Sequence, residues 1–245
     1  MGIARLLWDI DDTLFDYTTA ERLGVLQHLS DEGLLSEFDS PERALSLWQQ
    51  DMEYAYARFL AGELGFLEHR RERVRLFLGR TGRSLPDTRA TDAWFGRYVR
   101  CYEDHWRIFP DVLPVLDALR HRYRHGLLSN SSTPHQHRKL KKLGLRRRFS
   151  SLVCSDEIGC AKPAAEAFAA GCAGLRLPAD QVAYIGDKLT TDALGALGAG
   201  LLPVWIDRPA TDPEPAPSGV HRIHTLADLP GLLEVIDFGA VPPIG

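Results

Sequence analysis

Three carboxylates stand within four residues near the start of the chain, at Asp9, Asp11 and Asp12. They follow the apolar run 5–8, which predicts a short buried strand because it is too brief for a helix and too apolar for a loop. Carboxylates this close repel one another, and a divalent cation that prefers oxygen ligands is the usual compensation. Asp9 and Asp11 are expected on one side of the chain because strand side chains alternate. They could divide nucleophilic and acid/base work, although a solvated turn rich in aspartate is also compatible with the pattern.

The other polar candidates stand at or just after the ends of later expected strands. They are Ser129 and Asn130 after the run 126–129, Lys162 after 152–154, and Asp187 and Asp192 after 182–185. In an open parallel sheet the carboxyl ends of the strands line one crevice, so the chain is expected to bring these distant segments together. A turn or a helix cap explains any one of them alone, whereas their joint convergence indicates an active site.

Four short motifs together resemble those of the haloacid dehalogenase superfamily, in the same order and with similar spacing. They are Asp-x-Asp-x-Thr at 9–13, Leu-Ser-Asn at 128–130, Lys-Pro at 162–163, and Gly-Asp at 186–187 followed after four residues by Asp192. The resemblance covers nearly the whole chain. It implies a Mg²⁺-dependent phosphatase that acts on a small phosphorylated metabolite such as a nucleotide, a sugar phosphate or phosphoglycolate.

The resemblance also assigns catalytic roles. Asp9 is then the nucleophile that forms an aspartyl-phosphate, and Asp11 is the acid that protonates the leaving alcohol and later the base that activates water. Ser129, Asn130 and Lys162 bind the transferring phosphoryl group, and both Ser129 and Lys162 assist its transfer.

A magnesium site follows from the same resemblance. An oxygen of Asp9, the backbone carbonyl of Asp11 and the carboxylate of Asp187 are its ligands, and Asp192 binds the ion directly or through water. The expected cofactor is therefore Mg²⁺, which also offsets the repulsion between these carboxylates and the substrate phosphate.

The periodicity of the chain predicts an α/β fold with a doubly wound parallel sheet. Strands alternate with helices from residue 106 onward, whereas residues 17–105 show helical periodicity and no convincing strand. We therefore expect a Rossmann-like catalytic core at 1–16 and 106–245, with an α-helical bundle inserted at 17–105. The resemblance identifies that bundle as a cap domain that selects the substrate. Pro203, within the fifth expected strand at 202–206, predicts an edge position for that strand.

Composition narrows the class of protein. The chain has 245 residues, an apolar content of 44%, a formal net charge of −4 and a pI near 6.1, so nothing global indicates binding to nucleic acid or to an anionic membrane. No apolar stretch approaches the roughly 18 residues of a membrane span, and no signal-like segment opens the sequence. The four cysteines lack paired spacing and are expected to be reduced thiols in a cytoplasmic monomer or homodimer.

Three rival interpretations remain at this point. Haloacid dehalogenases use the first aspartate but lack the second and need no metal, so Asp11, Asp187 and Asp192 favour phosphate chemistry. A phosphomutase uses the same core residues and returns the phosphoryl group to a sugar. A non-catalytic relative that binds a ligand or partner usually lacks a motif residue, and none is missing here. The basic run 69–75 is expected to be mainly a solvated helix face, with contact to an anionic substrate group as the alternative. The basic run 138–148 is not expected to bind nucleic acid.

Overall fold

The computed structural model describes residues 2–210 and 213–239, which form two compact units. Unit 1 combines residues 1–16 with 107–245, and unit 2 comprises residues 17–106. Trp106 packs edge-on against Tyr102 and falls within unit 2. Each unit is described by itself.

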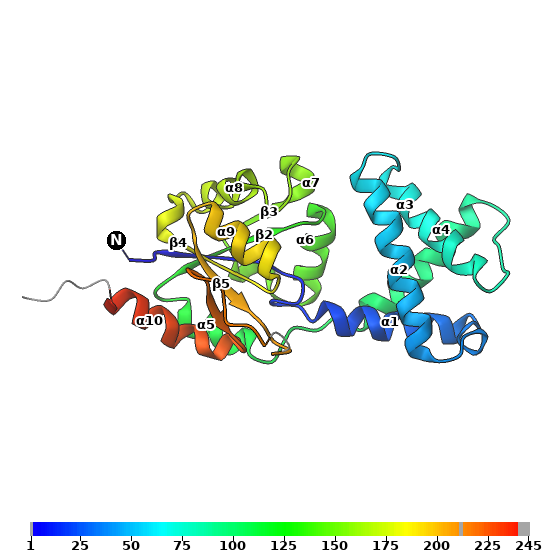
Figure 1. The fold of residues 1–245 in the computed structure, drawn as a ribbon, viewed down its shortest axis with the longest axis horizontal. Helices are drawn as coiled ribbons and strands as arrows, with labels where there is room; N and C mark the ends of the chain where they lie inside the picture. The colour runs from blue at the N-terminus through cyan, green and yellow to red at the C-terminus, as the bar shows by residue number, and fades with distance from the viewer. Residues whose placement is uncertain (1, 211–212, 240–245) are drawn as a thin grey trace, which may run out of the picture. The chain divides into compact units, whose positions relative to one another are not determined.

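Unit 1 is built on a sheet of six parallel strands in the order β3-β2-β1-β4-β5-β6. The strands are β1 (Arg5–Trp8), β2 (Arg124–Ser129), β3 (Ser151–Cys154), β4 (Val182–Gly186), β5 (Leu202–Ile206) and β6 (His221–Ile223). Helices α8 and α9 lie on one face of the sheet, and α5 and α10 lie on the other (Figure 1). The predicted doubly wound parallel sheet is therefore confirmed. Strands that are covered on both faces bury the side chains of both sides, which is why they appear in the sequence as continuous apolar runs.

The edge position that Pro203 predicts for β5 is wrong. The strand β6 pairs with β5 and takes the edge of the sheet in its place. Pairing with β6 starts at Val204, one residue after Pro203, so the missing N–H of the proline removes no hydrogen bond from that ladder. The sequence did not indicate β6 because its three residues, His221 to Ile223, are too few to show a period.

The helices of unit 1 connect and cover these strands. They are α5 (Val112–Leu119), α6 (Thr133–Lys142), α7 (Ser155–Ile158), α8 (Ala165–Leu175), α9 (Gly195–Gly198) and α10 (Leu229–Gly239). Short 3₁₀ turns occur at η2 (Arg146–Arg148), η3 (Ala179–Gln181) and η5 (Leu226–Asp228), and η4 (Leu189–Leu194) is a π-helical turn. A buried apolar cluster that includes Leu7, Leu128 and Phe168 holds α8 against the central strands.

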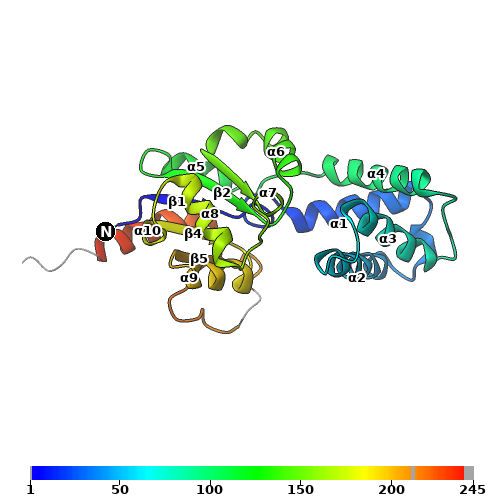
Figure 2. The same ribbon diagram turned by 90° about the horizontal axis from the view of Figure 1, so that it is seen from above.

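Unit 2 contains four α-helices and no strand among its described residues. They are α1 (Tyr17–Asp31), α2 (Pro41–Leu60), α3 (Phe66–Gly79) and α4 (Thr88–Asp104), with a 3₁₀ turn η1 (Leu35–Glu37). Helix α1 packs beside α4, and α2 packs beside α3 (Figure 2). Ser40 caps α2 by accepting from the Arg43 N–H at 3.1 Å, and Asp87 caps α4 by accepting from the Ala90 N–H at 2.7 Å, so both starts follow from local sequence.

The interior of unit 2 is aromatic and also contains the buried guanidinium of Arg73. Trp48 contacts Phe77 and Trp94 edge to face or tilted, with ring centroids 5.1 and 5.9 Å away. The guanidinium of Arg73 lies 3.9 Å from the centroid of a Trp48 ring and pairs with Glu21 at 3.1 Å. Arg73 therefore belongs to the core of the bundle rather than to a solvated basic face.

Two further features concern the environment of the protein. No helix in the described part of the chain is both long and apolar enough to cross a membrane. All four cysteines are free thiols, and two of them, Cys154 and Cys172, are buried.

Candidate active site

The chain turns sharply after β1 and presents two carboxylates at the sheet edge. The Asp9 N–H donates to the Ile185 carbonyl on β4 at 2.8 Å, which extends strand pairing by one residue. Asp12 then adopts a left-handed conformation with φ 57°, and its N–H donates to the Phe15 carbonyl at 2.7 Å. Aspartate is among the few non-glycine residues that tolerate this backbone region. The turn therefore depends on Asp12, while Asp9 and Asp11 are left to point their side chains into the site.

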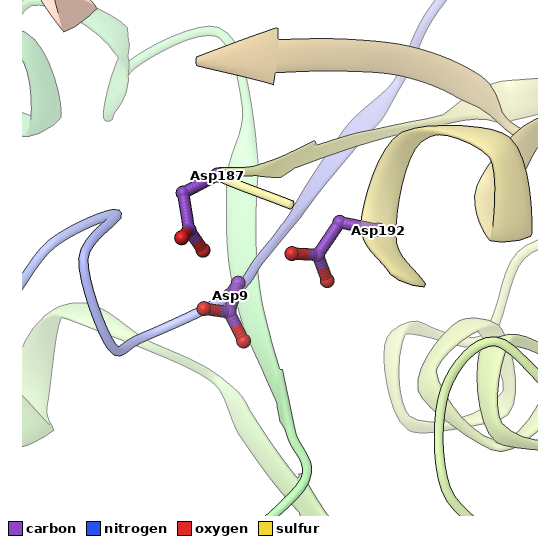
Figure 3. Close-up of side chains that lie close together, drawn as sticks. All are labelled: Asp9, Asp187 and Asp192. Atoms are coloured by element: carbon purple, nitrogen blue, oxygen red, sulfur yellow. The ribbon is translucent and has the colours of Figure 1, made fainter. Parts of the chain in front are cut away.

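Three carboxylates from distant parts of unit 1 converge at this edge. Asp9 follows β1, Asp187 follows β4, and Asp192 lies in the π-helical turn after β4, and their side chains point toward one another (Figure 3). One oxygen from each lies within 4.8 Å of the others. Gly186 permits this approach, because a Cβ at that position would lie 2.6 Å from the side chain of Asp192.

Burial and mutual repulsion change how readily these carboxylates ionise. Burial and the neighbouring Asp192 and Asp11 charges raise the pKa of Asp9 to about 7, although Lys162 opposes this shift. Burial, together with Asp9, Asp192 and Asp12, raises the pKa of Asp187 to about 8. The site therefore lacks positive charge for the number of carboxylates that it holds.

Lys162 is the buried cation of the site. Its Nζ lies 2.6 Å from Asp9 Oδ1 and 2.6 Å from Asp192 Oδ1, and it donates to the Tyr184 hydroxyl at 2.7 Å. The Tyr184 hydroxyl in turn donates to Asp192 Oδ1 at 2.9 Å. Burial would lower the pKa of Lys162, but the Asp9 and Asp192 carboxylates raise it well above its usual value. Lys162 is therefore a permanent positive charge directly beside Asp9.

The side-chain amide of Asn130 forms two hydrogen bonds with the backbone of Lys162. Its Nδ2 donates to the Lys162 carbonyl at 2.8 Å, and its Oδ1 accepts from the Lys162 N–H at 2.8 Å. These two bonds use both ends of the side-chain amide. The Asn130 side chain thus holds the loop that carries Lys162.

Asp11 and Ser129 are connected through helix α6. Gln136 Nε2 donates to Asp11 Oδ2 at 2.9 Å and to Ser129 Oγ at 3.1 Å, and Lys139 forms an ion pair with Asp11 Oδ1. Burial would raise the pKa of Asp11, but the charge of Lys139 and the hydrogen bonds from Lys139 and Gln136 bring it below its ordinary value. Asp11 is thus held as a carboxylate with a separate donor on each oxygen.

Comparison with known proteins identifies the family. The model of the haloacid dehalogenase-like hydrolases matches residues 3–200. The chain belongs to this family. It is 29% identical to a glyceraldehyde 3-phosphate phosphatase of Methanopyrus kandleri, over 84% of each chain, and 25% identical to human N-acylneuraminate-9-phosphatase, over 97% of each. The haloacid dehalogenase-like hydrolase is thus an enzyme with phosphatases among its relatives.

Solved structures share the fold of this haloacid dehalogenase-like hydrolase. The HAD-hydrolase YfnB from Bacillus subtilis, solved bound to magnesium, superposes with a TM-score of 0.76 at 22% identity, over 96% of this chain and 100% of the other. At this level of identity the comparison shows the fold alone.

The carboxylate cluster of this haloacid dehalogenase-like hydrolase fits a divalent cation that prefers oxygen. Asp187 Oδ1 is buried and has no hydrogen-bond partner in the described part of the chain. A buried polar atom of this kind requires compensation, and an ion among Asp9, Asp187 and Asp192 would supply it. Asp192 already accepts a hydrogen bond from Lys162 and another, at 3.0 Å, from the Lys188 N–H. Its oxygens therefore have more hydrogen-bond donors around them than those of Asp9 or Asp187 in the described part of the chain.

Three residues of the site were not indicated by the sequence. Tyr184 reads as an apolar strand residue, and Gln136 and Lys139 lie in or beside a basic run, although they are 0% and 1% exposed. The one available signal was spacing: Gln136 and Lys139 share a helix face, and Leu140 adjoins it. The burial of Lys139 among solvated basic residues becomes apparent only once the position of helix α6 in the fold is known.

Proposed function

We propose that this enzyme is a Mg²⁺-dependent phosphomonoesterase that acts on a small phosphorylated metabolite through an aspartyl-phosphate. The observation that supports this most is the contact of Lys162 with Asp9 beside the Asp187 and Asp192 carboxylates. Phosphoryl transfer needs an ionised nucleophile and several positive charges around the transferring group, because the phosphoryl oxygens repel an approaching carboxylate. A buried lysine and a carboxylate cluster suited to a cation meet both needs.

In the first half-reaction, an oxygen of Asp9 attacks phosphorus and the bond to the ester oxygen breaks. For this step Asp11 must carry a proton, which it gives to the departing alkoxide; an alcohol leaves, Asp11 remains as a carboxylate and Asp9 carries the phosphoryl group. Ser129 Oγ would donate to a phosphoryl oxygen, and Lys162 would supply a fixed positive charge beside Asp9. Asn130 contributes by holding the Lys162 backbone.

In the second half-reaction, water attacks the phosphorus of the aspartyl-phosphate. Asp11, now a carboxylate, takes a proton from that water, and the bond from phosphorus to the Asp9 oxygen breaks. Inorganic phosphate leaves and Asp9 is restored. The ionised state in which Lys139 and Gln136 hold Asp11 is the state required of a base.

Asp9, the Asp11 backbone carbonyl and Asp187 would hold Mg²⁺, with Asp192 bound directly or through water. When bound, the ion supplies positive charge that offsets the repulsion between these carboxylates and the phosphate. The raised pKa values of Asp9 and Asp187 support this assignment, because a nearby cation is what would return both groups to the ionised form.

The names of the relatives support a small substrate. One is a glyceraldehyde 3-phosphate phosphatase and another an N-acylneuraminate-9-phosphatase, and both names describe removal of phosphate from a small molecule. The names differ from each other, so they define a class and not one compound. A nucleotide, a sugar phosphate or a short phosphorylated acid falls within that class.

The rival activities are weakened by particular residues. A dehalogenase lacks the second aspartate, whereas Asp11 is present and held by two buried side chains. A phosphomutase shares the core residues and would reveal itself by a requirement for a sugar bisphosphate. A non-catalytic relative would bind ligand in stoichiometric amount and release no phosphate.

The deciding experiment measures phosphate release from a panel of phosphorylated metabolites, with Mg²⁺, with EDTA and with EDTA followed by excess Mg²⁺. The Asp9→Asn variant is the blank. We expect release that stops with EDTA, returns with Mg²⁺ and is absent from the variant. Phosphate release that is unchanged by EDTA, or that persists in Asp9→Asn, would refute the proposed mechanism.

A further inference from the structure

Two buried polar side chains of α6 converge on the residues that we assign to acid/base and phosphate-binding work. Gln136 is 0% exposed and Lys139 is 1% exposed, and they lie one turn apart on the same helix face. A lysine is rarely so buried, because desolvating its charge is costly unless a partner compensates it. These two residues therefore need an explanation beyond packing.

Their contacts hold Asp11 at two points. Lys139 pairs with Oδ1 of Asp11, and Gln136 Nε2 donates to Oδ2 at 2.9 Å. One ion pair alone would leave the carboxylate free to rotate about the Cβ–Cγ bond. A separate donor on each oxygen defines both its position and its plane, which is what directed proton transfer requires.

Gln136 also couples Asp11 to the phosphate-binding loop. The same Nε2 donates to Ser129 Oγ at 3.1 Å, while Gln136 Oε1 is buried and has no hydrogen-bond partner in the described residues. The Nε2 of this side-chain amide therefore donates to Asp11 and to Ser129, two residues of the proposed chemistry. The helix that carries Gln136 begins at Thr133, four residues after Ser129, so the two groups are also close along the chain.

We propose that Gln136, together with Lys139, is a positioning residue that orients the acid/base carboxylate of Asp11 relative to the phosphoryl group at Ser129. This inference rests on the phosphatase function proposed above. Neither residue touches the reacting atoms in this role. Both act through Asp11, so their loss should affect most the step in which a poor leaving group needs a proton.

The test compares kcat/KM of wild type and Gln136→Met for two substrates. They are the best alkyl phosphate of the metabolite panel and p-nitrophenyl phosphate, whose leaving group needs little protonation. We expect a loss of at least about tenfold with the alkyl ester and less than about threefold with the aryl ester, with KM nearly unchanged. The matched control is Gln49→Met, which removes an exposed glutamine that donates to Glu53 at 3.0 Å, and it should leave both values unchanged.

Lys139→Met extends the test to the second donor. In Lys139→Met, kcat/KM should likewise fall more for the alkyl ester than for the aryl ester. Lys141 is an exposed lysine on the same helix, and Lys141→Met should change neither value. Thermal midpoints of all variants report whether they fold. If Lys139→Met does not fold, Gln136→Met still decides the proposal, because that change removes no charge.

A double-mutant cycle separates positioning from a merely structural role. In an Asp11→Ala background, Gln136→Met should lower kcat for the alkyl ester by less than about twofold, because the group that it orients is already gone. Equal losses for both esters in the single variant, or a full further loss in the Asp11→Ala background, would overturn the proposal. If wild type hydrolyses neither ester, the proposed function itself fails and this role fails with it.

Discussion

Asp9 illustrates how the site adjusts a single carboxylate. It is 7% exposed, and burial among other carboxylates raises its pKa to about 7, while Lys162 opposes the shift from 2.6 Å away. A group with this pKa is only partly ionised near neutral pH. Its activity as a nucleophile therefore depends on positive charge that its neighbours and a bound cation supply.

Replacing Asp9 with asparagine should abolish turnover without unfolding the protein. We expect a loss of at least about a thousandfold in kcat, because the nucleophilic oxygen is removed. The thermal midpoint should be equal or higher above about pH 7, since the raised pKa means that the ionised Asp9 destabilises the folded state there. Phosphate release and thermal unfolding measure the two effects, with the exposed Asp180→Asn as control. Retained activity would show that Asp9 is not the nucleophile.

Replacing Asp11 with alanine should discriminate between leaving groups. Alkyl phosphates leave as alkoxides and need a proton, so we expect their kcat/KM to fall by about a hundredfold or more, and that of p-nitrophenyl phosphate to fall far less. Steady-state kinetics with both esters provide the measurement. Equal losses would mean that Asp11 is not the general acid.

At the scale of elements, the end of β4 decides how the carboxylates meet. Gly186 closes the strand, and the π-helical turn η4 follows and places Asp192 against it. The Asp192 N–H donates to the Lys188 carbonyl at 2.8 Å, and so does the Ala193 N–H at 3.2 Å. Such a widened turn is uncommon and frequently marks functional sites. Here it turns Asp192 back toward Lys162.

Replacing Gly186 with alanine should therefore damage both stability and metal binding. The new Cβ would lie 2.6 Å from the side chain of Asp192, so we expect a loss of about 1–3 kcal/mol in the free energy of unfolding and a weaker response to Mg²⁺. Gly198→Ala is the matched control, because a Cβ there has no atom within 4 Å. Chemical denaturation with and without Mg²⁺ compares them. A Gly186 variant that behaves like the control would exclude this steric role.

At the scale of the whole molecule, the site makes stability depend on pH. The pKa values of Asp9 and Asp187 rise from 3.8 to about 7 and about 8 on folding, so the folded chain binds more protons than the unfolded chain across that window. Stability contributed by these groups is therefore lost as pH rises from about 4 to about 8. A cation that binds the ionised carboxylates acts in the opposite direction.

Stabilisation by Mg²⁺ should consequently increase with pH. We expect excess Mg²⁺ to raise the thermal midpoint more at about pH 8 than at about pH 5, because protons compete with the ion for Asp9 and Asp187 at the lower pH. Thermal unfolding at both pH values, with and without Mg²⁺, is the measurement. Asp187→Asn should lose most of the effect. A shift of the same size at both pH values would contradict the assignment of these carboxylates as ligands.

Several parts of this architecture could be predicted from the sequence. Apolar runs predicted five of the six strands, because such runs depend on neighbours along the chain. The contact of Asn130 with Lys162, and those of Gln136 and Lys139 with Asp11, could not be predicted in this way. They join residues 32, 125 and 128 positions apart.

The sequence by itself determined the family, the parallel α/β core, the helical insertion and the polar residues at the strand ends. These follow from periodicity and from motifs whose residue types are dictated by chemistry. Only the tertiary structure decided the roles of Tyr184, Gln136 and Lys139, the π-helical turn at Asp192 and the inner position of β5. The physical reason is that burial and hydrogen-bond partners across the sheet depend on how elements dock, and a side chain's local sequence does not contain that information.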